Sequence, residues 1–325
     1  MKSFVHVNAR DVKDAVGKLR QPSAMVVGGG SDLLGMVKEH LVQPDVLVNL
    51  KTVRGLDGIS SRARRETIIG GLATLDTLSR HPMVREQYAV LAEAAESVGT
   101  PQIRNAGTLA GNVCQRPWCW YYRNGFPCFK AGGKQCFSIT GENQFHAIFG
   151  GGPSFIVHPS DTAPALVALD AKFQVAGPGG ARTVPAAEFF TLPRANAARE
   201  NVLAEGEILT AVHLPAPRPN VRSTYHKVLD RESWTHAVVS AAIVLEMDQQ
   251  FCKSARLVLG GVAPIPWRLP KVEAMLAGQR ITPELAAQAG EAALAGANPL
   301  AKNAYKVPLT KAVVRRTLVE LAGRA

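Results

Sequence analysis

Four of the five cysteines of this 325-residue chain lie within one 23-residue stretch that begins at Cys114 and ends at Cys136. Cys119 and Cys128 lie between them, and the fifth, Cys252, stands alone far downstream. Glycine, proline and aromatic residues surround the group, as expected of a loop that wraps a compact centre. Four thiols this close together predict a disulfide set, a zinc site or an iron–sulfur cluster.

The spacing of the four cysteines bears on these three alternatives. Four, eight and seven residues separate successive cysteines, whereas structural zinc normally uses at least one C-x2-C pair. A plant-type [2Fe-2S] centre needs another cysteine soon after Cys119, and Trp120, Tyr121 and Tyr122 follow instead. Disulfides need an oxidising compartment. The pattern favours a [4Fe-4S] cluster, which accepts irregular loops, and leaves zinc and disulfides as alternatives.

Charge and hydrophobicity limit the possible partners. The formal net charge of +11 suits an anionic partner, either a nucleotide cofactor or an acidic subunit face. The basic residues are scattered and form no stripe interleaved with aromatic residues, so we expect no nucleic-acid binding. No run of eighteen apolar residues predicts a membrane span. The N-terminus lacks the pattern of a signal peptide, so the sequence by itself predicts a cytoplasmic protein.

The order of apolar and turn-forming segments predicts two domains. A strand at 24–27, a glycine turn, a helix at 33–40 and a strand at 46–50 form a βαβ-like unit, and further strands, including one at 154–157, follow up to residue 214. Pro215, Pro217 and Pro219 mark a break. After it, strands at 224–228, 237–247 and 254–260 precede three helices at 269–277, 283–295 and 311–322. We predict domains at 1–215 and 220–325.

Two glycine-rich segments are the candidate cofactor site. The first joins a strand to a helix and consists of Val26, Val27, Gly28, Gly29, Gly30, Ser31, Asp32 and Leu33. The second is 105–112, with Thr108, Gly111 and Asn112. Backbone N–H groups approach a phosphate closely only where side chains are absent, so the two loops could clamp one diphosphate. The alternatives are two unrelated turns, with Asp32 as a helix N-cap.

The order of these motifs resembles that of the FAD-binding medium subunits of molybdenum hydroxylases, the xanthine dehydrogenase family. The resemblance rests on the first glycine loop, on 103–112, on His158-Pro-Ser-Asp161, and on 225–231 and 259–264 in the C-terminal part. The segment 115–123 is similar to the flavin subunit of periplasmic aldehyde oxidoreductases, in which an inserted segment binds a [4Fe-4S] cluster. The resemblance covers essentially the whole chain.

This resemblance implies a fold and a set of FAD contacts. The fold is α+β: a two-subdomain FAD-binding fold of the vanillyl-alcohol-oxidase type (subdomains about 1–55 and 56–215, with an iron–sulfur insertion at 113–150), followed by an α+β C-terminal domain with an antiparallel sheet and helices. Both glycine loops would hold FAD. Asp161 would accept a hydrogen bond from a cofactor hydroxyl, Leu209 would offer its backbone, and Lys227 would lie near the flavin. The alternatives are an N-cap role for Asp161 and a solvated Lys227.

The resemblance also implies a cluster ligand set. Cys119, Cys128 and Cys136 match three cluster cysteines of the aldehyde oxidoreductase relatives, whereas the position of the fourth is occupied here by Ser154. Cys114 is the one local thiol left, so we expect it to complete the set. Basic residues of the insertion would offset the negative charge of the cluster or be solvated; they are Arg116, Arg123 and Lys130.

The implied function is that of an electron-transfer flavoprotein subunit without catalytic residues of its own. Its partners would be a large molybdenum-cofactor subunit, a small [2Fe-2S] subunit and an external electron acceptor, and a partner's twin-arginine signal could carry it to the periplasm. Alternatives are a stand-alone flavin oxidoreductase, a zinc-stapled interaction protein, or the flavin subunit of a xanthine, carbon monoxide or 4-hydroxybenzoyl-CoA type enzyme.

Overall fold

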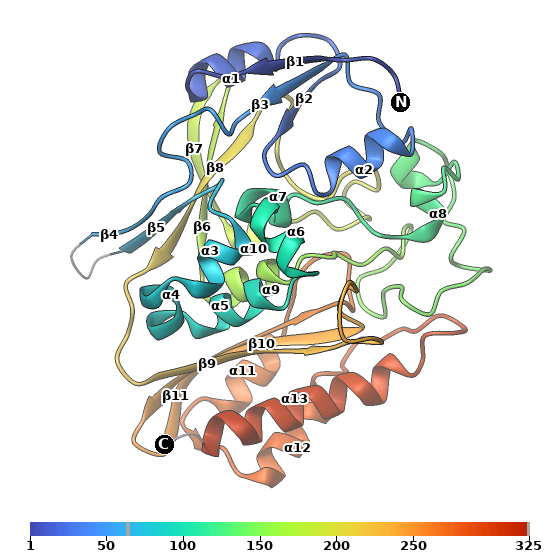
Figure 1. The fold of residues 1–325 in the computed structure, drawn as a ribbon. Helices are drawn as coiled ribbons and strands as arrows, with labels where there is room; N and C mark the ends of the chain where they lie inside the picture. The colour runs from blue at the N-terminus through green and yellow to red at the C-terminus, as the bar shows by residue number, and fades with distance from the viewer. Residues whose placement is uncertain (63–65, 324–325) are drawn as a thin grey trace.

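The computed structural model describes residues 1–62 and 66–323, which form three β-sheets and the helices packed around them (Figure 1). The first sheet is parallel, with strand order β1-β3-β2. Its elements are β1 (Val5–Asn8), α1 (Val12–Lys18), β2 (Ala24–Val27), α2 (Leu33–Lys38) and β3 (Val46–Asn49). The first glycine loop is the turn between β2 and α2, as the sequence predicts.

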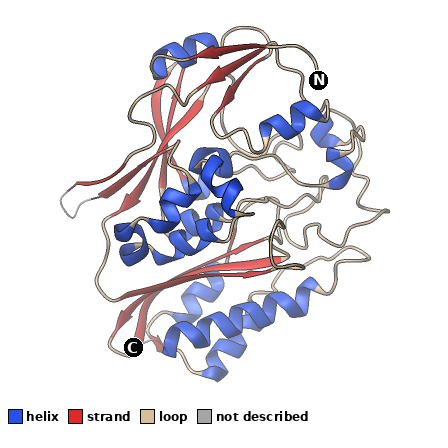
Figure 2. Ribbon diagram, in the orientation of Figure 1, coloured by secondary structure: helices blue, strands red, loops and turns tan. Residues whose placement is uncertain are grey.

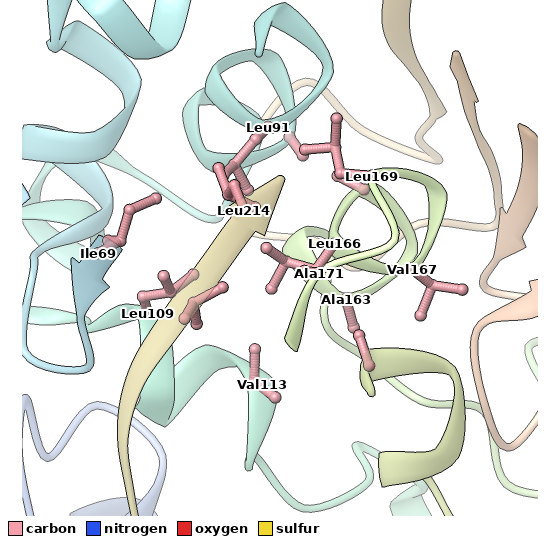
Figure 3. Close-up of a cluster of buried hydrophobic side chains, with 14 of the residues drawn as sticks. Ile69, Leu91, Leu109, Val113, Ala163, Leu166, Val167, Leu169, Ala171 and Leu214 are labelled. Carbon is pink, nitrogen blue, oxygen red and sulfur yellow. The ribbon is translucent and has the colours of Figure 1, made fainter. Parts of the chain in front are cut away.

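The second sheet is antiparallel, with strand order β4-β5-β8-β6-β7. Its strands are β4 (Ile59–Arg62), β5 (Glu66–Gly70), β6 (Lys172–Gly177), β7 (Gly180–Pro185) and β8 (Ile208–Pro215). The helices of this part are α3 (Leu75–Arg80), α4 (Pro82–Gln87), α5 (Ala89–Glu96), α6 (Pro101–Ala106), α7 (Leu109–Val113), α9 (Thr162–Ala168) and α10 (Ala186–Phe189). Apolar side chains from β5, β8, α5, α7 and α9 meet in the main core (Figure 3).

The third sheet belongs to the C-terminal part and has the order β12-β11-β10-β9, with β13 paired to β11. Its elements are β9 (Val221–Val228), β10 (Val239–Asp248), β11 (Phe251–Gly260), β12 (Trp267–Arg268), α11 (Pro270–Leu276), β13 (Gln279–Arg280), α12 (Pro283–Ala292) and α13 (Lys306–Gly323). Helices α5 and α9 cover one face, and α11 and α13 cover the other (Figure 1). Residues 239–245 of β10 are therefore all buried, which explains why all of them except Ser240 are apolar.

The cysteine-rich insertion contains little regular structure. Its short helices are α8 (Trp120–Arg123) and a single 3-10 turn, η1 (Phe129–Ala131), and Figure 2 shows most of the remainder as loop. The strand predicted at 154–157 is absent: these residues form no ladder, although Ser154 and Ile156 are buried. Burial without pairing accounts for that error, because apolar character alone does not distinguish a buried loop from a strand.

The predicted α+β class is confirmed by this arrangement of sheets and helices. Within the described part of the chain, no helix combines the length and the apolar character needed to cross a membrane.

Candidate functional site

A cavity of about 320 Å³ lies beside the two glycine loops. Six of the residues predicted for the cofactor site line it: Ser31, Asp32, Thr108, Gly111, Asn112 and Asp161. The other predicted residues do not line this cavity: Val26, Val27, Gly28, Gly29, Gly30, Leu33, Leu209 and Lys227. A volume above about 300 Å³ is in the range of small-molecule sites.

The two glycine loops contact each other directly. A Cβ atom at Gly29 would lie 2.0 Å from the carbonyl oxygen of Ala106, and a Cβ at Gly28 would lie 3.2 Å from Thr108 Oγ1. Gly30 has a φ of +73°, which side-chain-bearing residues rarely adopt. The loops are therefore not two unrelated turns. Gly29 permits close contact between the two backbones, and the phosphate approach expected from the sequence stays a prediction.

Two predicted side chains of the second loop make internal hydrogen bonds. Thr108 Oγ1 accepts from the backbone N–H of Gly111 (3.2 Å) and caps α7. Asn112 Oδ1 accepts from the hydroxyls of Ser160 (2.6 Å) and Thr162 (2.6 Å). Asn112 therefore fixes the second loop to the start of α9, next to Asp161.

Asp161 and Lys227 form a buried ion pair, with both side chains only 4% exposed. Lys227 Nζ donates to Asp161 Oδ2 (2.7 Å) and to the carbonyl oxygen of Ser97 (3.0 Å), and the Tyr225 hydroxyl donates to Asp161 Oδ1 (2.7 Å). Asp161 is the N-cap residue of α9, but its side chain makes no capping bond. Side-chain capping therefore does not explain Asp161, and the solvated-lysine alternative is wrong. Lys227 stands behind Asp161 and holds it at the cavity wall.

Several residues of the cavity wall were missed by sequence reasoning. Trp118 comes from the insertion, and Arg231, Trp234 and His236 come from the loop between β9 and β10. The rings of Trp118 and His236 lie 5.4 Å apart. Trp234 is 57% exposed and has a φ of +55°, an unusual conformation for a bulky residue. An aromatic pair, Trp234 and His236, in a polar hairpin loop was the sequence signal for this wall.

Ion pairs connect the insertion to Asp32 of the first glycine loop and to Glu200. Asp32 makes no capping bond to α2; its carboxylate accepts from the backbone N–H of Arg116 (2.9 Å) and from Arg123 Nη2 (2.7 Å). Glu200 pairs with Arg116 and Lys130, with an N–O separation of 2.9 Å in each case. The three basic residues are therefore paired with carboxylates, so the alternative that they are solvated is wrong, and their effect on a cluster stays a prediction. Through Asp32, they couple the insertion to the cavity.

Three of the four clustered thiols lie in one region. Cys119 and Cys128 pack in one apolar cluster with Met36 and Tyr122. Burial raises the pKa of the Cys119 thiol to about 11, and the charges of Cys136 and Cys128 contribute in the same direction. Cys119 Sγ lies 3.3 Å from His146 Nε2. All five cysteines of the chain are free thiols, so the disulfide alternative is wrong for this structure.

Cys114 packs against a different apolar cluster from Cys119 and Cys128. It packs against the main core, and burial is the one influence that raises its pKa, to about 12. Within residues 1–62 and 66–323, no three His, Cys, Asp or Glu side chains converge as the ligands of a single ion would. Such convergence is what a zinc site requires. In a cluster, each ligand binds a different iron, so the thiols need only face one common space.

A second cavity, of about 130 Å³, adjoins the first. Cys119 and His146 line it together with Trp120 and Phe145. Its remaining wall includes four residues that also line the first cavity: Trp118, Pro159, Thr235 and His236. The thiol region and the glycine-loop cavity are therefore separated by a single layer of side chains.

The segment that carries His146 is clamped by the C-terminal domain. The backbone N–H of Lys302 donates to Asn143 Oδ1 (2.9 Å). Asn303 Nδ2 donates to the carbonyl oxygen of His146 (3.0 Å), and Lys306 Nζ donates to the carbonyl oxygen of Phe145 (2.9 Å). Burial, with a smaller effect of Lys306, lowers the pKa of His146 to about 4. The imidazole is therefore neutral at physiological pH.

Lys306 should make the stability of this clamp rise with pH. It is fully buried, donates also to the carbonyl oxygen of Gly261 (2.7 Å), and burial lowers its pKa to about 7. The unfolded value is about 10.4, so between these limits the unfolded chain binds more protons and stability increases with pH, by at most about 1.4 kcal/mol per pH unit. Urea unfolding at several pH values should show this slope, and Lys306→Met should reduce it. Equal slopes for the two proteins would contradict the assignment.

Comparisons with known proteins find FAD-binding domains and subunits that are similar to this chain. Residues 2–217 match the family model described as FAD binding domain in molybdopterin dehydrogenase, and residues 224–321 match the CO dehydrogenase flavoprotein C-terminal domain. The chain is 33% identical to the aldehyde oxidoreductase FAD-binding subunit PaoB of Escherichia coli (strain K12), over 100% of both chains. It is 28% identical to the carbon monoxide dehydrogenase medium chain of Hydrogenophaga pseudoflava, over 97% of this chain and 96% of that one.

A solved structure shows a similar fold. Carbon monoxide dehydrogenase from Hydrogenophaga pseudoflava, in a form that lacks the Mo-pyranopterin moiety, aligns with a TM-score of 0.77 and 25% identity. The alignment covers 98% of this chain and 96% of that chain.

Proposed function

The chain belongs to the FAD-binding medium subunits of the molybdenum hydroxylases, and from this premise we propose that it is the electron-transfer subunit of an aldehyde-oxidising complex. Membership makes it an oxidoreductase component. The observation that carries the proposal is the cavity beside two glycine loops that contact each other. Full-length similarity to an aldehyde oxidoreductase subunit supports the aldehyde assignment.

The polar groups of the cavity wall support FAD as its occupant. The two loops would hold the diphosphate through backbone N–H groups where they line the cavity, at Ser31 and Asp32 in the first loop and at Gly107 and Thr108 in the second. Asp161 is fixed by Tyr225 and Lys227 on the wall, where its carboxylate would accept a hydrogen bond from a cofactor hydroxyl. Bound FAD would supply a carrier that accepts and releases electrons in the complex. The protein's part is to bind and orient it.

We also propose that the insertion holds a [4Fe-4S] cluster, as an additional electron carrier. The support comes from three thiols in one region: Cys119, Cys128 and Cys136. The cavity lined by Cys119 shares a wall with the glycine-loop cavity, and this closeness suits exchange of electrons between two centres. Cys114 stays a prediction of the sequence that its position in the main core does not support.

The proposed partners follow from the family. A large molybdenum-cofactor subunit would oxidise the aldehyde, a small [2Fe-2S] subunit would relay electrons, and an external acceptor would receive them. Similarity to a carbon monoxide dehydrogenase medium chain keeps a carbon monoxide type enzyme as the second candidate. A partner carrying a twin-arginine signal would place the complex in the periplasm.

The isolated chain should contain flavin and iron but should not oxidise aldehydes. We expect its visible spectrum to show flavin bands above a broad iron–sulfur absorption, and we expect no steady turnover of an aldehyde, because the oxidising centre is proposed to lie on another subunit. Adding the two partner subunits should produce turnover. Steady aldehyde oxidation by the chain alone would instead identify a stand-alone flavin oxidoreductase.

A further inference from the structure

We propose that Trp118 of the cysteine-rich insertion is a cofactor-binding residue, against whose indole the isoalloxazine ring of FAD packs. The inference rests on the FAD site proposed above and adds to it a side chain that neither glycine loop supplies. It gives the insertion a role in positioning the flavin, whichever metal centre the thiols hold.

The first observation is that Trp118 lies on the walls of both cavities. In the cavity of about 320 Å³ it is joined by Ser31 and Thr108 of the two glycine loops. In the cavity of about 130 Å³ it is joined by Cys119, the next residue in the chain. Of the residues that line both cavities, tryptophan has the largest aromatic surface to offer to a flat ligand.

The second observation is the exposure of the indole. Trp118 is 46% exposed although it lines a cavity, whereas Tyr122 of the same insertion is 3% exposed. The insertion can therefore bury an aromatic ring, yet it leaves this one open. Exposed apolar surface at a concave site is typical of a ligand-binding wall, because the ligand completes the burial.

The third observation is that the open indole is held in place. The guanidinium carbon of Arg123 lies 4.4 Å from the centroid of the indole, and the ring of His236 lies 5.4 Å away. Arg123 is itself 8% exposed and donates to Asp32 Oδ1 (2.7 Å) and to the carbonyl oxygen of Pro117 (2.9 Å). A ring fixed in this way loses little conformational entropy when a ligand covers it.

The choice between the two ring systems of FAD follows from electron transfer. The isoalloxazine is the part of FAD that accepts and releases electrons. Trp118 belongs to the layer of side chains between the glycine-loop cavity and the thiol region. An isoalloxazine packed on this layer would be close to a centre held by the thiols, whereas adenine in the same place would contribute nothing to electron exchange.

The affinity for FAD tests the aromatic contact. Trp118→Leu keeps an apolar side chain but removes the ring, so FAD should bind about twofold to tenfold more weakly, which is the worth of one aromatic pair. Trp118→Phe keeps a ring and should bind FAD within about twofold of the wild type. Titration of the apoprotein of each full-length chain with FAD measures both.

Flavin fluorescence tests which ring of FAD meets Trp118. An indole in contact with the isoalloxazine quenches its emission by electron transfer, and a phenyl ring does not. At equal FAD and iron content, Trp118→Phe should therefore emit more strongly than the wild type. Trp120→Phe is the matched control: it is the same change two residues away, and Trp120 lines the second cavity but not the first. Its emission and its FAD affinity should equal those of the wild type.

The outcomes separate this inference from the function on which it rests. Equal emission from Trp118→Phe and the wild type would overturn it even if Trp118→Leu bound FAD weakly, because the indole would then face adenine or act through packing alone. An increase of the same size in Trp120→Phe would also overturn it, since quenching would not depend on the cavity wall. A wild-type chain that binds no flavin would instead overturn the proposed FAD site.

Discussion

Gly29→Ala is expected to yield a folded chain that purifies with little or no FAD. The new Cβ would lie 2.0 Å from the carbonyl oxygen of Ala106, so one of the two glycine loops must move. Side-chain rotation cannot relieve this contact, because the backbone fixes the positions of both the Cβ atom and the carbonyl oxygen. Overpacking of this kind costs about 1–3 kcal/mol, and a loop displaced beside the cavity should weaken FAD binding by about tenfold to a hundredfold. Flavin per chain and titration of the apoprotein with FAD measure the effect.

Gly35→Ala is the matched control. Gly35 lies in α2, six residues away in the same segment, and a Cβ there would meet nothing within 4 Å. Alanine in a helix interior should stabilise the chain by up to about 1 kcal/mol relative to glycine and leave FAD binding unchanged. If Gly29→Ala retained the flavin content of Gly35→Ala, contact between the loops would not be what shapes the FAD site.

The sequence predicted the glycine turn at 28–32 but not the contact that requires Gly29. A turn between a strand and a helix is a local feature, and the pattern from Val27 to Leu33 contains it. The close approach of Gly29 to Ala106 joins segments far apart in the chain, and no local pattern encodes it. The same limit applies to Asp161, whose partners Tyr225 and Lys227 lie on a strand of the other domain.

The iron–sulfur region shows a further limit of sequence reasoning. Counting thiols selected Cys114, since it is near the other three in sequence. In the structure, Cys114 ends α7 and packs against the main core, and a long irregular loop brings His146 to Cys119. A buried histidine in such a loop carries no sequence signal, because the contacts that position it come from residues 302–306. The apolar run in β10, by contrast, could be recognised in the sequence, because both faces of the strand are buried and all of residues 239–245 except Ser240 are apolar.

Lys227→Met is expected to cost about 3–5 kcal/mol in the free energy of unfolding. The substitution removes the ammonium from a pair whose side chains are 4% exposed, so the Asp161 carboxylate would remain buried with the Tyr225 hydroxyl as its one described donor. An uncompensated buried charge is costlier than the loss of the attraction alone. FAD binding should weaken as well, because Asp161 lines the cavity and Lys227 holds it there. Urea unfolding and FAD titration measure the two effects.

A double-mutant cycle and an exposed lysine decide whether the buried pair is the cause. Asp161→Asn combined with Lys227→Met should cost less than the sum of the single changes, since the double variant leaves neither charge unpaired. Lys253→Met is the control: Lys253 pairs with Glu246 on the third sheet, but its side chain is 66% exposed, so its loss should change stability by about 0.5 kcal/mol or less. Additive costs in the cycle, or a similar loss in the control, would show that Lys227 acts through packing and not through its charge. If the costs of the two changes are not additive and Lys253→Met leaves stability unchanged, the Asp161 carboxylate on the cavity wall depends on a cation supplied by the other domain. Binding of FAD and docking of the two domains would then be linked through one ion pair.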